Sequence, residues 1–126
     1  MNIRDVCFCG SGLAAIACCS RWLLGEAAPT AEALMRSRYA AFVLHNDPYL
    51  LATWHASTRP KSVEFDDNQK WLGLKIVASR DISAQTAEVE FIARYRIGGG
   101  SAARLHECSQ FIKEDGRWFY VDGVIK

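Results

Sequence analysis

The most regular pattern in the chain is Thr86-Ala-Glu-Val-Glu-Phe-Ile-Ala-Arg-Tyr-Arg-Ile97, residues 86–97. Apolar and charged side chains alternate along it, which is the period of an extended strand with one buried face. The apolar face carries Ala87, Val89, Phe91, Ala93, Tyr95 and Ile97, and the opposite face carries Glu88, Glu90, Arg94 and Arg96. The pattern therefore predicts a strand in a sheet that is covered on one side.

Three neighbouring stretches have the same character. Residues 71–79, 102–113 and 117–125 are rich in β-branched and aromatic residues and also read as strands. Gly98-Gly99-Gly100-Ser101 follows residues 86–97 and leads into residues 102–113. Asp115-Gly116 lies between residues 102–113 and residues 117–125. Glycine adopts the positive φ values that tight hairpin turns require. The sequence thus predicts an antiparallel meander of three or four strands.

The region before these strands has helical periodicity. Thr30 is a predicted N-cap for a helix over residues 31–44, whose buried face we expect to carry Leu34, Met35, Tyr39, Phe42 and Val43. Asp47 and Pro48 predict the start of a second helix over residues 49–55. Because helices come first and strands follow, the fold class is α+β, and the absence of alternation argues against a Rossmann sheet.

Composition describes one globular domain. The 126 residues are 50% hydrophobic and 23% charged, with a net charge of +1. Such a chain forms one core, so any second feature must be small. The balanced charge makes nucleic acid an unlikely partner. The apolar stretches are too short to cross a bilayer, and the first residues do not form a signal peptide, which predicts a cytoplasmic protein.

Four of the five cysteines lie within thirteen residues: Cys7, Cys9, Cys18 and Cys19. Disulfides between such close neighbours would be strained and need an oxidising compartment. Four thiolates instead suit a tetrahedral Zn²⁺, and a closed set of ligands makes the site structural. Iron would accept the same ligands. Cys108 stands alone in a strand and is interpreted as a small buried hydrophobe.

The sequence around the cysteines predicts a turn followed by a short helix. Ser11 is a candidate N-cap for a helix from Leu13 to Cys19. Consecutive helical residues point about 100° apart, so Cys18 and Cys19 would share one ion only if the last turn of that helix loosened. Four thiolates around Zn²⁺ carry excess negative charge, for which Arg4 and Arg21 are the flanking cations.

The cysteine segment resembles a known motif. Cys7-Phe8-Cys9-Gly10-Ser11-Gly12-Leu13 with Cys18-Cys19 is similar to the SEC-C motif, the zinc knuckle at the tail of the preprotein translocase ATPase. That motif is usually written C-P-C-G-S-G, and Phe8 stands here in place of the proline.

The resemblance extends along the chain to the YchJ-type family of bacterial proteins. It is carried by residues 25–39, 53–55, 58–60, 71–74 and 114–118. It implies a metal-binding motif over residues 1–28 and a nuclear transport factor 2-like domain over residues 29–126, in which helices pack on a curved antiparallel sheet to form a cone.

A curved sheet that wraps around helices leaves a concave face where a ligand would bind. The candidate lining residues by type are Tyr39, Trp54, His55, Trp71, Glu90, Arg94, His106 and Trp118. His55 also reads as a C-terminal helix cap, and the aromatic residues as core. His106 and Glu107 are adjacent on a strand, so only one of them can face a cavity. Arg36 and Arg38, with Glu90 and Arg94, are either solvated charges or a buried network, and a buried network would imply an anionic ligand.

Two functions follow as hypotheses. The first is a protein-interaction or adaptor module in which the metal shapes a docking surface. The second is a small-molecule binder or acid/base enzyme that uses the cavity, although a fold by itself does not license that step. The sequence contains no P-loop, Gly-x-Ser-x-Gly or His-Glu-x-x-His motif, and it leaves the partner, substrate, oligomeric state and enzymatic activity undetermined.

Overall fold

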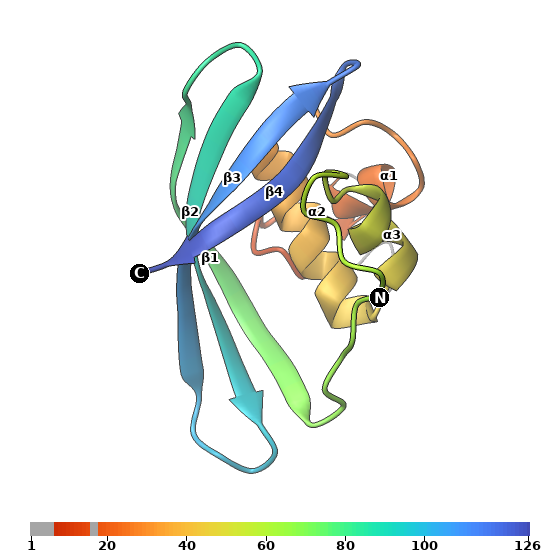
Figure 1. Ribbon diagram of the computed structural model, residues 1–126. Helices are drawn as coiled ribbons and strands as arrows, with labels where there is room; N and C mark the ends of the chain where they lie inside the picture. The colour runs from red at the N-terminus through yellow and green to blue at the C-terminus, as the bar shows by residue number, and fades with distance from the viewer. Residues whose placement is uncertain (1–6, 16–17) are drawn as a thin grey trace.

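The computed structural model describes residues 7–15 and 18–126 and has two layers, a four-stranded sheet and three helices packed on one of its faces (Figure 1). The helices are α1 (Cys19–Leu23), α2 (Ala31–Leu44) and α3 (Asp47–Ala52). The strands are β1 (Gln69–Asp81), β2 (Thr86–Ile97), β3 (Ala103–Glu114) and β4 (Arg117–Ile125). The predicted α+β class, with helices on an antiparallel sheet, is confirmed.

The sheet is a meander in the order β1-β2-β3-β4, with every neighbouring pair antiparallel. The β3–β4 turn has positive φ at Asp115 (51°) and Gly116 (80°), as a two-residue hairpin turn requires. Register shifts in β1 and at Gln110/Phe111 bend the strands, because a bulge increases local twist. The sheet therefore curves around the helical layer (Figure 1).

The two predicted helices form, the first with its predicted bounds and the second with both bounds shifted. The Thr30 side chain accepts a hydrogen bond from the Ala33 N–H at 3.0 Å and caps α2, as predicted. The second helix starts at Asp47 rather than Tyr49, because the Asn46 side chain provides the N-terminal cap. It ends at Ala52 rather than His55. No helix within residues 7–15 and 18–126 has the length and apolar character needed to span a membrane.

The prediction of a helix from Leu13 to Cys19 is wrong in its described part. Residues 13–15 are not α-helical, residues 16–17 lie outside the described chain, and α1 begins only at Cys19. Ser11 instead accepts a hydrogen bond from the Leu13 N–H and donates one to the Cys18 Sγ. Cys19 is thus the first residue of α1 and Cys18 precedes the helix. The two side chains therefore need not point about 100° apart, as consecutive residues inside a helix do.

Helix α2 lies between two clusters of buried side chains. Leu34, Met35 and Tyr39 pack against the inner face of the sheet, whereas Ala40 packs against the cysteines. The predicted inner face of β2 is buried at Ala87, Val89, Phe91 and Ala93, each at most 4% exposed. Ile97 is 54% exposed, contrary to prediction, since it ends the strand beyond the main core cluster.

Candidate metal centre and cavity

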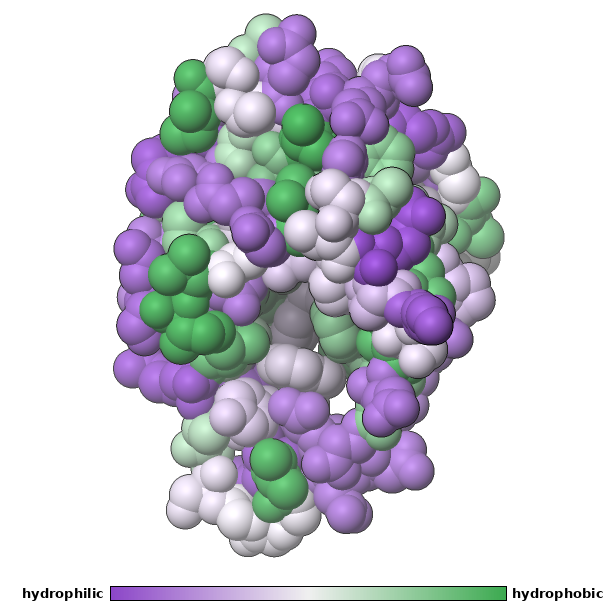
Figure 2. All heavy atoms as spheres, in the orientation of Figure 1, coloured by the Kyte–Doolittle hydropathy of each residue, from purple (hydrophilic) through white to green (hydrophobic). Residues whose placement is uncertain are grey.

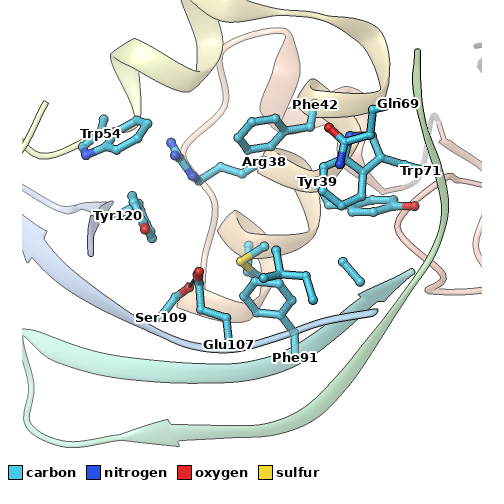
Figure 3. Close-up of a pocket in the computed structure, with 13 residues that line it drawn as sticks. Arg38, Tyr39, Phe42, Trp54, Gln69, Trp71, Phe91, Glu107, Ser109 and Tyr120 are labelled. Carbon is cyan, nitrogen blue, oxygen red and sulfur yellow. Dashed lines mark hydrogen bonds between the residues drawn. The ribbon is translucent and has the colours of Figure 1, made fainter. Parts of the chain in front are cut away.

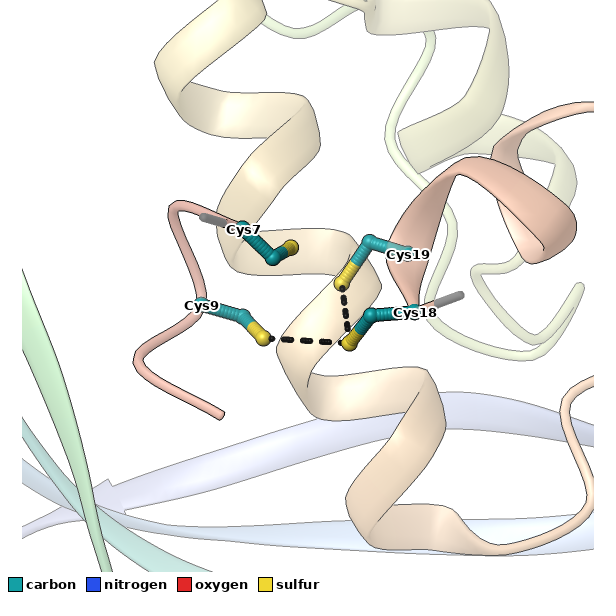
Figure 4. Close-up of side chains that lie close together, drawn as sticks. All are labelled: Cys7, Cys9, Cys18 and Cys19. Carbon is teal, nitrogen blue, oxygen red and sulfur yellow. Dashed lines mark hydrogen bonds between the residues drawn. The ribbon is translucent and has the colours of Figure 1, made fainter. Parts of the chain in front are cut away.

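The four clustered cysteines converge from two segments (Figure 4). Cys7 and Cys9 come from the turn before Gly10, and Cys18 and Cys19 from the beginning of α1. All four Sγ atoms lie within 4.8 Å of one another, with Cys9 and Cys18 3.5 Å apart and Cys18 and Cys19 3.8 Å apart. A tetrahedron with Zn–S bonds of about 2.3 Å has edges of about 3.8 Å, so the donor set fits one thiolate-bound metal ion.

Burial makes the protonation of these thiols interdependent. Each is at most 8% exposed. Contacts with the Cys19 and Cys7 thiols hold the pKa of Cys9 far below its usual range, and contacts with Cys7 and Cys9 raise the pKa of Cys19 far above it. One thiolate therefore suppresses ionisation of its neighbour. A bound cation is what would allow all four sulfurs to ionise together.

The segment with Cys7 and Cys9 is held against α2 and β1 by polar and steric contacts. Arg36 on α2 donates to the Cys9 carbonyl oxygen at 2.8 Å and to Glu32 at 3.2 Å. Gly10 has φ +78°, and a Cβ there would lie 2.7 Å from the Leu74 carbonyl oxygen. These contacts fix the cysteine segment to the larger layer.

A cavity of about 330 Å³ lies between α2 and the concave face of the sheet (Figure 3). Most of its lining is apolar, and the molecular surface is hollowed between the sheet and the helical side (Figure 2). The lining comprises Met35, Arg38, Tyr39, Phe42, Trp54, Gln69, Trp71, Phe91, Ala93, Leu105, Glu107, Ser109 and Tyr120.

Arg38 brings a buried positive charge to this cavity. The residue is 3% exposed, and its Nη1 donates to the Leu50 carbonyl oxygen at 2.8 Å and to the Thr53 Oγ1 at 2.7 Å. Its Cζ lies 5.1 Å from the ring centre of Trp54 and 4.5 Å from that of Tyr120. Burial lowers the pKa of Arg38 to about 10, so the guanidinium stays charged at neutral pH.

Glu107 brings the negative charge. The hydroxyl of Ser109, a fully buried residue, donates to its Oε2 at 2.8 Å. A side chain at position 123 would overlap the Glu107 carboxylate, so Gly123 on β4 leaves the space that this group occupies. The sheet is therefore shaped around the carboxylate.

The model of a protein family, described as "YchJ, middle NTF2-like domain", matches residues 30–123. The chain belongs to the YchJ family. This match confirms the predicted nuclear transport factor 2-like fold for the helices and sheet.

Relatives of this YchJ-family chain cover nearly its whole length. A UPF0225 protein of Polaromonas sp. is 56% identical over 117 residues, which are 90% of this chain and 84% of the relative. A UPF0225 protein of Xanthomonas campestris is 51% identical over 120 residues, 94% of this chain and 93% of the relative.

Two solved structures share the fold. The solution structure of a SEC-C motif containing protein from Rhodopseudomonas palustris matches with TM-score 0.85 and 37% identity, over 95% of this chain and 98% of that one. The crystal structure of a SEC-C motif containing protein from Psychrobacter arcticus matches with TM-score 0.79 and 27% identity, over 100% and 86%. The predicted family, with a SEC-C-type motif before the domain, is confirmed.

The structure brings together the four predicted cysteines, and of their two predicted cations it describes only Arg21. Arg21 forms an ion pair with Glu26 at 3.0 Å, and Arg4 lies outside the described residues. Among the residues that the structure describes, Arg36 hydrogen-bonds to the cysteine segment from another element, 27 residues from Cys9. Local spacing gave no signal for this contact.

Of the eight predicted lining residues, Tyr39, Trp54 and Trp71 line the cavity. Glu90, Arg94 and His106 do not, because each alternates along its strand with inward-facing residues and so lies on the outer face of the sheet. Glu90 accepts a hydrogen bond from the His106 Nε2 there at 2.7 Å.

His55 and Trp118 also lie outside the cavity. The C-cap of α3 is Thr53, and His55 lies beyond it, with its Nε2 2.8 Å from the Glu114 Oε1. Trp118 is near the β3–β4 turn and lines a smaller hollow of about 150 Å³ with Trp22. The prediction that His106 and Glu107 face opposite sides is consistent with these positions, and Glu107 is the one that lines the cavity.

Sequence reasoning missed Ser109, Tyr120, Gln69 and Phe42 as lining residues and left the role of Arg38 open. The alternation along β3 that places Glu107 inward also places Ser109 inward, so that signal was available. An isolated parallel β-bridge joins Tyr120 to Trp54 and so positions Tyr120 at the cavity. No local sequence pattern predicts this bridge.

Proposed function

We propose that the four clustered cysteines hold one Zn²⁺ in a closed structural site, and that the knuckle they shape is a protein-docking module. The single observation that supports this is the convergence of four buried sulfurs, within 4.8 Å, from two short segments. Residues 1–28 then act as the metal-binding unit and residues 29–126 as its scaffold. Thiolate ligands must stay reduced, which favours the cytoplasm.

The ligand set favours a structural metal over a catalytic one. Four thiolates complete a tetrahedron and leave no position for water or substrate. Fe²⁺ accepts the same geometry, so zinc is proposed as the resident ion and iron as its alternative.

Elemental analysis of protein purified without added metal tests the site. We expect one zinc per chain, and loss of it in the Cys7→Ser/Cys9→Ser variant. Cys108→Ser is the matched control, because Cys108 is buried in β3 away from the cluster. Metal-free native protein with four reactive thiols would contradict the proposal.

Removal of the metal should affect the knuckle first. Binding of the ion is coupled to the folding of a segment that has little core of its own. After chelation we expect faster amide hydrogen exchange in residues 7–15 and 18–28, while the amides of β2 and β3 stay protected. Equal loss of protection throughout would show that the metal holds the whole fold instead.

The docking role is supported by apolar side chains next to the cysteines. Phe8 is 38% exposed and Leu13 is 53% exposed, on either side of the turn that holds Cys9 and Gly10. Affinity capture should yield partners with the wild type and lose them with Leu13→Asp, a variant in which all four cysteines are retained. Identical partners for wild type, Leu13→Asp and Cys7→Ser/Cys9→Ser would count against a docking role.

A second candidate function is small-molecule binding or acid/base chemistry in the cavity. It is favoured by an open volume of about 330 Å³ that contains a buried guanidinium and a carboxylate. Pockets of this size hold small ligands in other proteins. Solution NMR with the apolar probe toluene tests whether the cavity admits a guest, and unchanged resonances of Met35 and Leu105 would argue against it.

A further inference from the structure

The two charged side chains of the cavity lie at the same end of it (Figure 3). Arg38 points between Trp54 and Tyr120, and Glu107 lies near Ser109 on the sheet below. The other end is formed mainly by aromatic rings, among them Tyr39, Phe42 and Trp71, with the Gln69 amide beside them. The cavity is therefore amphipathic along its length.

Arg38 forms no direct salt bridge with a residue that the structure describes, and the charge of Glu107 reaches it only at longer range. Its two hydrogen bonds both come from Nη1 and reach neutral oxygens, and none from Nε or Nη2 is found within that part of the chain. A buried cation without a hydrogen-bonded carboxylate is costly, and two aromatic rings and the longer-range charge of Glu107 offset that cost only in part. A carboxylate that enters the cavity would pair with the guanidinium directly, in bidentate geometry.

Glu107 restricts what can accompany that carboxylate. One of its oxygens accepts from Ser109, and the group has further acceptor capacity next to the cavity. A purely anionic headgroup would be repelled there. A ligand group near Glu107 must therefore donate a hydrogen bond, as a hydroxyl or an amine does.

The volume sets the size of the part of a ligand that the cavity holds. A cavity of about 330 Å³ equals the volume of about eleven waters, at about 30 Å³ each, or a molecule of about a dozen non-hydrogen atoms. Most of those atoms must be apolar, because most of the lining is.

We propose that the cavity binds a small carboxylic acid with an apolar body and a hydroxyl or amine on the carbon next to its carboxylate. The carboxylate pairs with Arg38, and the neighbouring group donates to Glu107. The apolar body fills the end between Phe42, Trp71 and Phe91. This inference rests on the second proposed function and names its ligand class.

NMR titration of the full, metal-loaded chain tests the ligand class with three matched compounds. Mandelate carries both polar groups, phenylacetate lacks the hydroxyl, and 1-phenyl-1,2-ethanediol lacks the carboxylate. We expect mandelate to shift the indole N–H signals of Trp54 and Trp71 and to bind at least about tenfold more tightly than the diol, the value of one charge-assisted contact. Phenylacetate should fall between them.

Variants assign each polar group. Arg38→Gln should weaken mandelate at least about tenfold and leave diol binding unchanged, whereas Arg94→Gln, on the outer face of the sheet, should alter neither. Glu107→Gln should reduce the preference for mandelate over phenylacetate. Since Arg38 also supports α3, Arg38→Lys is a second variant that keeps the charge and should retain part of the affinity.

The results separate failure of the ligand class from failure of the cavity function. Equal affinity for mandelate and the diol, or equal effects of Arg38→Gln and Arg94→Gln, would overturn the carboxylate assignment. If toluene shifts the signals of Met35 and Leu105 while mandelate shifts none, the ligand class is wrong and the cavity function stands. If no compound shifts any lining signal, both are wrong.

Discussion

Gly10 is the residue at which the cysteine turn meets the sheet. Both Gly10 (φ +78°) and Gly12 (φ +82°) have left-handed backbone, but only at Gly10 would a Cβ collide, with the Leu74 carbonyl. Each alanine substitution costs about 1 kcal/mol or more for the conformation alone. We expect Gly10→Ala to lower the free energy of unfolding by clearly more than Gly12→Ala, as measured by urea denaturation. Equal losses would mean that the turn does not rest on β1 this closely.

Arg36 connects the cysteine segment to α2. It donates hydrogen bonds to the Cys9 carbonyl oxygen and to Glu32. Burial acts to lower the pKa of Arg36, but the side chains of Glu32 and Cys9 raise it overall. Arg36→Met should lower the stability of the metal-loaded protein by about 1–3 kcal/mol, since the bond to Cys9 is charge-assisted. Glu32→Gln is the control, because it keeps that bond and should cost much less. Thermal unfolding of the two variants provides the measurement, and similar melting temperatures would contradict the role.

At the scale of elements, the start of α2 depends on one hydroxyl. Thr30 Oγ1 accepts from the Ala33 N–H at 3.0 Å. Thr30→Ala removes this cap and should cost about 1 kcal/mol, whereas Thr30→Ser keeps the oxygen and should cost little. Chemical denaturation followed by circular dichroism compares the two variants. A loss of the same size in both would assign the effect to the methyl group.

Elements with a local signal were predicted well. The period-2 pattern of β2 and the Asp115-Gly116 turn are properties of adjacent residues, and the predicted bounds 86–97 and 117–125 match β2 and β4. The short helix near the cysteines was misplaced because the Ser11 hydroxyl, which accepts from the Leu13 N–H, also donates to the Cys18 Sγ seven residues away, a contact that the local pattern does not show.

At the scale of the whole molecule, two tyrosines report on the packing of α2 against the sheet. Burial raises the pKa of Tyr39 and of Tyr120 to about 12, against about 10 in an unfolded chain. The neutral phenols therefore contribute stability that is fully present below pH 10 and is lost as the pH rises through about 12.

Spectrophotometric titration at alkaline pH checks this expectation. The phenolate absorbance of these two residues should appear late and together with the loss of circular dichroism, and Tyr120→Phe should remove part of that late step. Burial also lowers the pKa of the neighbouring Arg38, whose contribution to stability rises rather than falls over this pH range. Phenolate absorbance therefore reports the ionisation of the tyrosines more directly than a measurement of stability does. Complete titration near pH 10 with the fold intact would contradict the buried environment.

The sequence by itself determined the fold class, the strands, the cap of α2 and the four candidate metal ligands. Each depends on a repeat, a turn or a spacing among near neighbours, which is the range over which backbone geometry is set by local residues. Only the tertiary structure decided that Arg36 contacts the cysteine segment and that Arg38 and Glu107 share a cavity from which His55, Glu90, Arg94 and His106 are absent. Those relations follow from the packing of α2 between the cysteines and a curved sheet, and packing between distant segments has no signature in the order of residues.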